Sequence, residues 1–179
     1  AATTGKKWRV AICARTAAEL AEKWSVFEQY GPEGQSGNIL KLQQKGIYCG
    51  TGEPLTSDKI AWMFPGQASQ YPNMLKSLYE NYPALESFAK QVDAIWKARY
   101  GYPVTSLIFG NDEAAIGQQL KDTKNTHPAM FLSNMAIYKL LLESGVEAGY
   151  MIGHSLGEIT ALHAGGILDL KSALHLTGE

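Results

Sequence analysis

The sequence predicts an α/β fold, because short apolar strands alternate with helical segments along the chain. Residues 8–14, "WRVAICA", are rich in β-branched and apolar residues and precede a helical pattern. Residues 60–64 form a short, nearly continuous apolar run, which is typical of a strand covered on both faces. Residues 147–153, "EAGYMIG", form a further strand directly before the helical segment 156–168. This order of strand, helix, strand and helix predicts parallel strands joined by helical crossovers.

The first helix is expected over residues 16–30. Thr16 is followed three places later by Glu19, which is the spacing of a capping box. Gly31 ends the helical pattern. Apolar residues recur at helical spacing along this segment at Ala17, Leu20, Trp24 and Phe27.

Residues 32–57 are rich in Gly, Ser and Gln, which predicts a loop with one short strand near "GIYCG". We place a domain boundary at the end of this stretch. The sequence then divides into a small α/β segment, residues 1–57, and a larger domain, residues 58–179.

Three helices are expected in the larger domain between the strand 60–64 and the strand 147–153. One begins near Met74, and a second runs from about Pro83 to Arg99 with a regular apolar side. The stretch 101–124 has a mixed pattern. The strongest helical pattern in the chain is "THPAMFLSNMAIYKLLLESG", which Gly145 ends.

Composition excludes several classes of protein. The chain has 179 residues, 45% of them apolar and 18% charged, as expected for one globular domain with or without a small appendage. A formal net charge of -1 gives no electrostatic reason to bind nucleic acid or an anionic membrane surface. No apolar run is long enough to span a bilayer, and "AATTGKKWRV" has neither a signal-peptide core nor an initiator methionine. We therefore expect an excerpt or a processed piece of a longer cytoplasmic protein.

Two cysteines, Cys13 and Cys49, form no metal-ligand pattern. Their expected state is that of reduced thiols in a cytosolic protein.

The segment "GYMIGHSLGEITALHAGGIL" contains the strongest signal for chemistry. Gly-x-Ser-x-Gly between a strand and a helix is a nucleophile elbow, in which a sharp turn exposes the serine hydroxyl at the helix N-terminus. Gly153 and Gly157 remove side chains where the strand and helix crowd together. The amide of Leu156 can then donate to an oxyanion that develops beside Ser155. The alternative is that Ser155 is only a helix N-cap, with glycines for packing.

A second stretch, "MFPGQASQYPNM", follows the strand 60–64. It delivers Gln67 into a loop, where its backbone amide can act as a second oxyanion donor. The alternative is an ordinary loop between a strand and a helix.

Together, "FPGQASQ", "THPAMFLSNMAIYKLL" and "GHSLGE", in this order, resemble the acyltransferase family. This family includes the malonyl-CoA:acyl-carrier-protein transacylases and the acyltransferase domains of polyketide and polyunsaturated fatty acid synthases. The resemblance covers residues 58–179 and implies an α/β-hydrolase-like parallel sheet core, of which this chain holds the N-terminal part. Residues 1–57 resemble the end of the linker between a ketosynthase and an acyltransferase.

The resemblance assigns roles to four residues. Ser155 matches the nucleophile that accepts the acyl group, and His154 matches a residue that shapes the substrate pocket. Gln67 and Leu156 match the oxyanion-hole positions, and an apolar residue at Leu156 is similar to malonyl-selecting members.

Two positions depart from the family pattern. Ala68 replaces a glycine of the family's GQGSQ loop and would be strained if that position needs a positive φ. His127 stands where many members have glutamine, and we expect it to make a local hydrogen bond at a helix start.

None of the four histidines is a convincing base for Ser155. In the family, the base is a histidine about a hundred residues after the serine, and an arginine about 25 residues after it binds the malonyl carboxylate. Both positions fall beyond Glu179. We therefore expect residues 1–179 alone to transfer acyl groups poorly and to be marginally stable. The cut should leave the 129–144 helix and the serine strand partly uncovered unless another chain covers them.

The resemblance implies transfer of a malonyl group from CoA to the phosphopantetheine thiol of an acyl carrier protein, in fatty acid or polyketide synthesis. It implies no metal and no redox cofactor. Acyl-CoA, the carrier protein and a neighbouring ketosynthase domain are the implied partners. Two alternatives remain, namely a serine hydrolase or thioesterase and a non-catalytic docking fragment.

Overall fold

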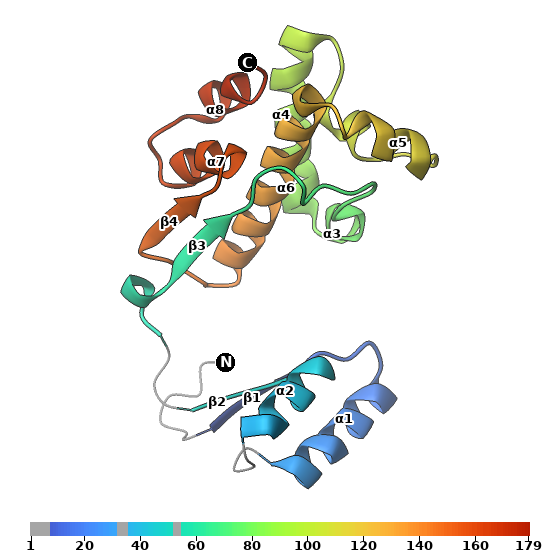
Figure 1. Cartoon of the computed structure of the whole chain (residues 1–179), viewed down its shortest axis with the longest axis vertical. Helices are drawn as coiled ribbons and strands as arrows, with labels where there is room; N and C mark the ends of the chain where they lie inside the picture. The colour runs from blue at the N-terminus through green and yellow to red at the C-terminus, as the bar shows by residue number, and fades with distance from the viewer. Residues whose placement is uncertain (1–7, 32–35, 52–54) are drawn as a thin grey trace. The chain divides into compact units, whose positions relative to one another are not determined.

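The computed structural model describes residues 8–31, 36–51 and 55–179, and the chain forms two compact units, Ala1–Leu55 and Thr56–Glu179 (Figure 1). The division lies two residues before the boundary that we placed after residue 57. Both units combine helices with strands, so the predicted α/β class is confirmed.

The described part of the small unit contains two strands and two helices. Strand β1 (Trp8–Ile12) pairs antiparallel with β2 (Ile47–Thr51), with Val10 opposite Cys49. Helices α1 (Ala17–Tyr30) and α2 (Ser36–Gln44) connect them. Because the chain runs through two helices in succession, it returns to the end where β1 finished, and β2 must run in the opposite direction.

Two sequence predictions for this unit were wrong. The strands are not parallel, and α2 occupies residues that we expected to form a loop. The Gly, Ser and Gln content of this stretch favoured a loop in the prediction. The stretch nevertheless contains an apolar residue that the fold buries, Leu42 of α2. The expected loop segments 32–35 and 52–54 lie outside the described residues.

The N-terminus of α1 is capped much as predicted. Thr16 Oγ1 accepts a hydrogen bond from the backbone N–H of Glu19 at 3.1 Å. The Glu19 carboxylate accepts from the N–H of Arg15 at 2.7 Å, one residue earlier than a reciprocal capping box requires. The helix is nevertheless poorly covered, since none of its residues is buried.

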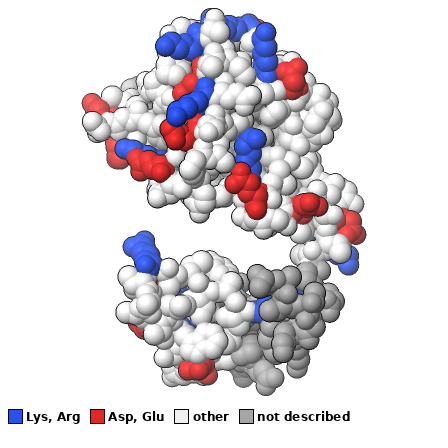
Figure 2. Space-filling view, turned by 180° about the vertical axis from the view of Figure 1, so that it is seen from behind, with Lys and Arg blue, Asp and Glu red and all other residues white. Residues whose placement is uncertain are grey.

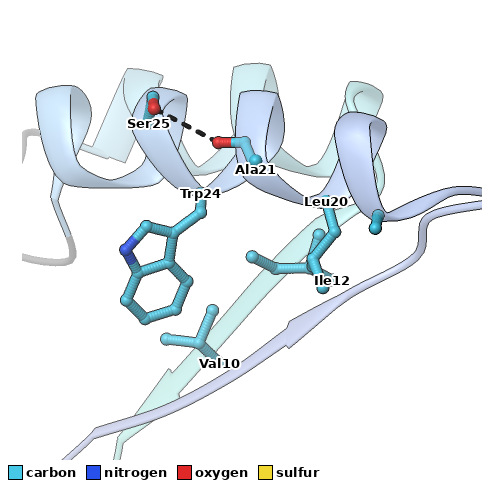
Figure 3. A pocket seen from close by; sticks show the side chains of 7 residues that line it. Val10, Ile12, Leu20, Ala21, Trp24 and Ser25 are labelled. Atoms are coloured by element: carbon cyan, nitrogen blue, oxygen red, sulfur yellow. Dashed lines mark hydrogen bonds between the residues drawn. The ribbon is translucent and has the colours of Figure 1, made fainter.

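An open apolar groove lies between α1 and β1 (Figure 3). Val10 and Ile12 of the strand face Leu20 and Trp24 of the helix across it. Leu20 and Trp24 remain 46% and 48% exposed. The apolar periodicity of α1 therefore does not produce a closed core in this unit.

The large unit is built on a pair of parallel strands. Strand β3 (Ala61–Phe64) pairs with β4 (Tyr150–Gly153), with Met63 opposite Ile152. This confirms the predicted parallel arrangement in the part of the chain that carries both motifs. Helix α7 (Leu156–Ala164) follows β4 directly, and α6 (Thr123–Glu143) lies beside the strands (Figure 1).

The other elements of the large unit are helical. The long α4 (Pro83–Tyr100) agrees with the predicted helix, and α3 (Lys76–Asn81) starts two residues after the predicted position. The remaining elements are η1 (Ser57–Lys59), η2 (Val104–Leu107), α5 (Glu113–Gln119) and α8 (Leu170–Leu176). Within the described residues, no helix combines the length and apolar character needed to cross a bilayer.

Helix α6 forms the centre of the core. Every residue from 128 to 136 is buried, which is the pattern of a helix surrounded by protein on all sides. The expectation that the 129–144 helix would be partly uncovered is therefore not met over residues 128–136, but it is met toward the end of the helix, where residues 137–144 are half-buried or exposed and Leu142 is 39% exposed. The core residues that pack around it include Leu85, Val92, Trp96, Val104, Ile108, Leu120 and Leu174.

One face of the β3–β4 pair is exposed, as expected for the serine strand. Met63, Tyr150 and Ile152 are 76%, 58% and 49% exposed. Phe64, at the end of β3, is buried and its ring packs edge-on against Tyr138 of α6. The prediction that β3 is covered on both faces is not met within the described residues.

Charged side chains of both signs lie on the large unit (Figure 2). On the face shown, blue and red side chains are interspersed over most of the unit, and blue side chains gather along its upper edge. Ion pairs at helical spacing, such as Glu86 with Lys90 at 2.6 Å, account for part of this mixture. The surface agrees with the near-neutral net charge.

Candidate active site

Ser155 occupies a strained backbone conformation between β4 and α7. Its φ is 54° and its ψ is -121°, and a positive φ is rare for any residue with a side chain. Such a conformation costs on the order of 1–3 kcal/mol and persists only where surrounding structure enforces it. An observed outlier of this kind supports the hypothesis of a functional turn.

The side chain of Ser155 does not cap α7. It accepts no hydrogen bond from the first turn of the helix, and the residue is exposed. The first turn is closed by backbone bonds instead, from Gly157 N–H to His154 O and from Glu158 N–H to Ser155 O, both 2.9 Å long. The geometry therefore disfavours the N-cap alternative and leaves the hydroxyl available.

Two glycines make this turn possible. A Cβ on Gly157 would collide with the backbone carbonyls of Phe64 and Pro65. A Cβ on Gly153 would collide with the backbone at Gly157 and Glu158. The strand, the turn and the start of α7 are thus packed backbone against backbone, as the Gly-x-Ser-x-Gly pattern predicts.

The loop after β3 contacts the serine turn. The His154 N–H donates to Phe64 O at 3.2 Å, which extends the β3–β4 pairing to the turn. A Cβ on Gly66 would lie 2.6 Å from His154 O and 3.2 Å from Ser155 Cβ. Because Gly66 immediately precedes Gln67, the fold brings the two sequence motifs together.

Two backbone amides in this region have no acceptor. Within the described part of the chain, neither the N–H of Gln67 nor the N–H of Leu156 makes a hydrogen bond. Leu156 is the first residue of α7 and its side chain is buried, whereas Gln67 is exposed. A helix N-terminus and an adjacent free amide are the donors that stabilise a developing oxyanion.

Ala68 has a φ of 78°. The backbone at this position therefore occupies the left-handed region that glycine prefers, and the strain expected for an alanine here is present. The N–H of Ala68 donates to Gln70 Oε1 at 2.8 Å. This bond within the loop helps to hold the strained residue.

Sequence reasoning missed the side chains that fasten this loop to the rest of the unit. Asn134 of α6 donates through Nδ2 to Pro65 O at 3.0 Å, and Gln67 Nε2 donates to Thr123 Oγ1 at 3.0 Å. Gln70 Nε2 donates to Leu120 O at 3.2 Å. The available signal was an asparagine inside the apolar run "PAMFLSNMAIY", because a buried amide needs a partner.

The histidines are dispersed. His163 Nδ1 lies 2.8 Å from Leu168 O, His175 belongs to α8, and the exposed His154 lies beside Gly66. His127 is partly buried, and this burial lowers the pKa of its imidazole. Within the described residues, no histidine ring is hydrogen-bonded to Ser155, and the local hydrogen bond expected for His127 is absent.

No group of three or more His, Cys, Asp or Glu side chains suited to a metal ion occurs in the described residues. Cys13 is exposed, and Cys49 is partly buried with the pKa of its thiol raised by that burial. Both cysteines are free.

Comparisons with protein families and with individual proteins agree on one family. The profile described as "Acyl transferase domain" matches residues 61–177. The chain is 38% identical over 117 residues to the malonyl CoA-acyl carrier protein transacylase of Bacillus subtilis, which corresponds to 65% of this chain and 34% of that protein. The chain therefore spans about a third of this relative's length.

Solved structures agree with this fold. The acyltransferase domain from the second module of the salinomycin polyketide synthase superposes with a TM-score of 0.72 at 24% identity, covering 96% of this chain and 37% of that one. A malonyl transacylase solved in complex with the acyl-carrier protein of a type II polyketide synthase gives a TM-score of 0.56 at 34% identity, covering 66% of this chain and 36% of that one.

Proposed function

Because the chain belongs to the acyl transferase domain family, we propose that it carries the nucleophile and oxyanion hole of an enzyme that moves a malonyl group from CoA to an acyl carrier protein. The observation that carries this proposal is the strained, uncapped Ser155 beside two backbone amides without acceptors. The malonyl substrate and the carrier-protein acceptor are inferred from the names of the relatives.

The proposed reaction has two halves. Ser155 Oγ attacks the thioester carbonyl of malonyl-CoA, a general base takes its proton, and the oxygen of the tetrahedral intermediate accepts bonds from the amides of Gln67 and Leu156. The C–S bond then breaks, CoA leaves as the protonated thiol, and a malonyl ester of Ser155 remains. In the second half the phosphopantetheine thiol attacks this ester and regenerates the serine. We assign His154, beside the loop, to the wall of the substrate pocket.

We propose that the general base and the arginine that binds the malonyl carboxylate belong to a part of the domain beyond residue 179. Two observations support this. The chain spans only about a third of its bacterial relative, and no histidine ring in the described residues is bonded to Ser155. No metal or redox group enters the proposed reaction.

The small unit fits the proposed linker to a neighbouring ketosynthase. The match to the polyketide synthase acyltransferase domain extends over 96% of the chain and so includes residues of this unit. We place the complete enzyme in the cytoplasm, where acyl-CoA and carrier proteins would meet it.

The decisive experiment detects the acyl-enzyme. The complete acyltransferase that includes residues 1–179 is mixed with malonyl-CoA and analysed by intact-protein mass spectrometry. A malonyl adduct should form and should be absent from Ser155→Ala. An adduct that survives this substitution would exclude Ser155 as the nucleophile.

The fate of the acyl group separates the rival functions. Carrier-protein thiol should discharge the adduct faster than water, whereas a hydrolase or thioesterase would release free malonate at a rate independent of carrier protein. A docking fragment would form no adduct at all.

Residues 1–179 expressed alone test the position of the base. Loss of a general base reduces rates by about 10²–10⁴-fold, so malonyl transfer by the isolated chain should fall at least that far. Turnover close to that of the complete domain would place the base within these residues.

A further inference from the structure

One buried side chain holds the backbone of the loop after β3. Asn134 lies in the middle of α6 and is 8% exposed. Its neighbours in the run 128–136 are all buried. An amide in such a place is stabilised only when it is hydrogen-bonded. The bond from Nδ2 to Pro65 O, 3.0 Å long, meets this need and spans 69 positions in the sequence.

The acceptor of this bond lies next to the proposed oxyanion hole. The Pro65 carbonyl belongs to the peptide unit that leads into Gly66, and the following peptide unit carries the N–H of Gln67. The same carbonyl would lie 3.0 Å from a Cβ on Gly157, so it also contacts the first turn of α7. Asn134 therefore acts where the loop and the serine turn touch.

The other two side-chain hydrogen bonds of the loop hold the Gln67 amide less directly. The bond from Gln67 Nε2 to Thr123 Oγ1 joins two exposed residues, and Gln70 acts two residues beyond Ala68. Exposed hydrogen bonds compete with water and fix a backbone less firmly than buried ones. Gln70 donates to Leu120 O in a bond that is part-buried, as the Asn134 bond is, but Gln70 lies three residues beyond Gln67. Asn134 is the buried side chain that acts on the peptide unit next to that of the Gln67 amide.

We propose that Asn134 is a positioning residue for the oxyanion hole: by donating to Pro65 O from the rigid core helix α6, it sets the orientation of the Gln67 amide toward the oxyanion on Ser155. The inference rests on the proposed role of Ser155. Asn134 does not touch the substrate, so its removal should slow acylation without weakening the binding of malonyl-CoA.

Two variants of Asn134 test this in the complete acyltransferase. Asn134→Leu has a similar size and suits the apolar surroundings, but it cannot donate to Pro65 O. Asn134→Ala also removes the donor and places neither a charge nor extra volume in the core. Where Asn134→Leu fails to fold, Asn134→Ala provides the same test.

The expected result is a loss in the acylation rate constant. Removing an oxyanion donor costs about 10²–10³-fold in rate, and a displaced donor should cost less, about tenfold to a hundredfold. The rate is measured by rapid quench and intact mass at saturating malonyl-CoA. The affinity for malonyl-CoA is measured in a Ser155→Ala background, where it should be the same with and without the change at Asn134.

A core variant controls for general destabilisation. Val92 of α4 is fully buried and lies in the same core, so Val92→Ala should lower stability without moving the loop. Its acylation rate should equal that of the unmodified protein at temperatures where both are folded.

Each outcome has a distinct meaning. Acylation rates within twofold of the unmodified protein in a folded Asn134 variant would overturn the inference while the function of Ser155 stands. Equal losses in Val92→Ala would also overturn it, because the effect would then be one of stability. The absence of any adduct in the unmodified protein would overturn both the proposed function and this inference.

Discussion

The two units of the chain use similar sequence patterns and reach very different degrees of burial. In the small unit, the described core consists of Leu42 and Ile47, and α1 has no buried residue. In the large unit, α6 is buried on all sides over residues 128–136. Helix α4 of the large unit is a closer match to α1, since both have apolar residues at helical spacing, yet α4 buries five residues and α1 buries none. Helical periodicity alone therefore does not determine how well a helix is covered.

The difference lies in the number of layers around the central element. In the large unit, α6 lies beside the sheet and packs against α4 and α7. In the small unit, the groove between α1 and β1 stays open (Figure 3). Strained backbone needs rigid surroundings to persist, and the positive φ values of Ser155 and Ala68 both occur in the large unit. The better-packed unit is therefore the one able to hold a strained serine turn.

The largest effect is expected from a comparison of one tryptophan in each unit. Trp96 of the large unit is 1% exposed and stacks on Tyr100 at a centroid distance of 4.0 Å, whereas Trp24 of the small unit is 48% exposed. Truncation of a buried tryptophan costs about 3–5 kcal/mol, so Trp96→Ala should lower the free energy of unfolding by that amount. Trp24→Ala should cost less than about 1 kcal/mol, because surface changes are usually small.

Urea denaturation followed by circular dichroism measures both losses. Equal losses would contradict the comparison, since they would mean that the groove beside Trp24 is covered in solution.

The second test compares a tightly packed glycine of the large unit with an unhindered glycine of the small unit. Gly157 lies against the carbonyls of Phe64 and Pro65, while a Cβ on Gly50 of β2 would meet no atom within 4 Å. Overpacking typically costs about 1–3 kcal/mol, and Gly157→Ala should reach the upper part of that range because backbone cannot move aside easily. Gly50→Ala should leave the stability unchanged or slightly increased.

The midpoint of thermal unfolding distinguishes the two variants. A Gly157→Ala protein as stable as the unmodified one would mean that the serine turn is looser than the packing indicates.

The sequence predicted the large unit better than the small unit. In the large unit, the helix over 83–99, the long helix ending near Gly145 and the parallel strands were predictable, because each pattern was long or sharply bounded. In the small unit, α2 was missed, since its apolar positions are few and lie among polar residues. Turn geometry at Ser155 was predictable from two glycines. The contact of Asn134 with Pro65 was not, because no local pattern specifies a partner 69 positions away.

The smallest effect is expected at two residues, one in each unit, that share a positive φ. Gly46 of the small unit has a φ of 72° and Ala68 of the large unit has a φ of 78°. An L-residue in this region is disfavoured by about 1–2 kcal/mol relative to glycine, partly offset by the greater flexibility of glycine in the unfolded chain. Ala68→Gly should therefore stabilise the chain by up to about 1 kcal/mol, and Gly46→Ala should destabilise it by a similar amount.

Both changes are measured by urea denaturation, with Gly50→Ala as the control at a glycine that has no positive φ. A stability loss in Ala68→Gly would mean that the methyl group of Ala68 makes contacts that outweigh its backbone strain. The acylation rate of Ala68→Gly extends the test to function. If the rigidity of the loop after β3 orients the Gln67 amide, the glycine variant should gain stability without gaining rate, because glycine relieves strain while adding freedom beside the donor.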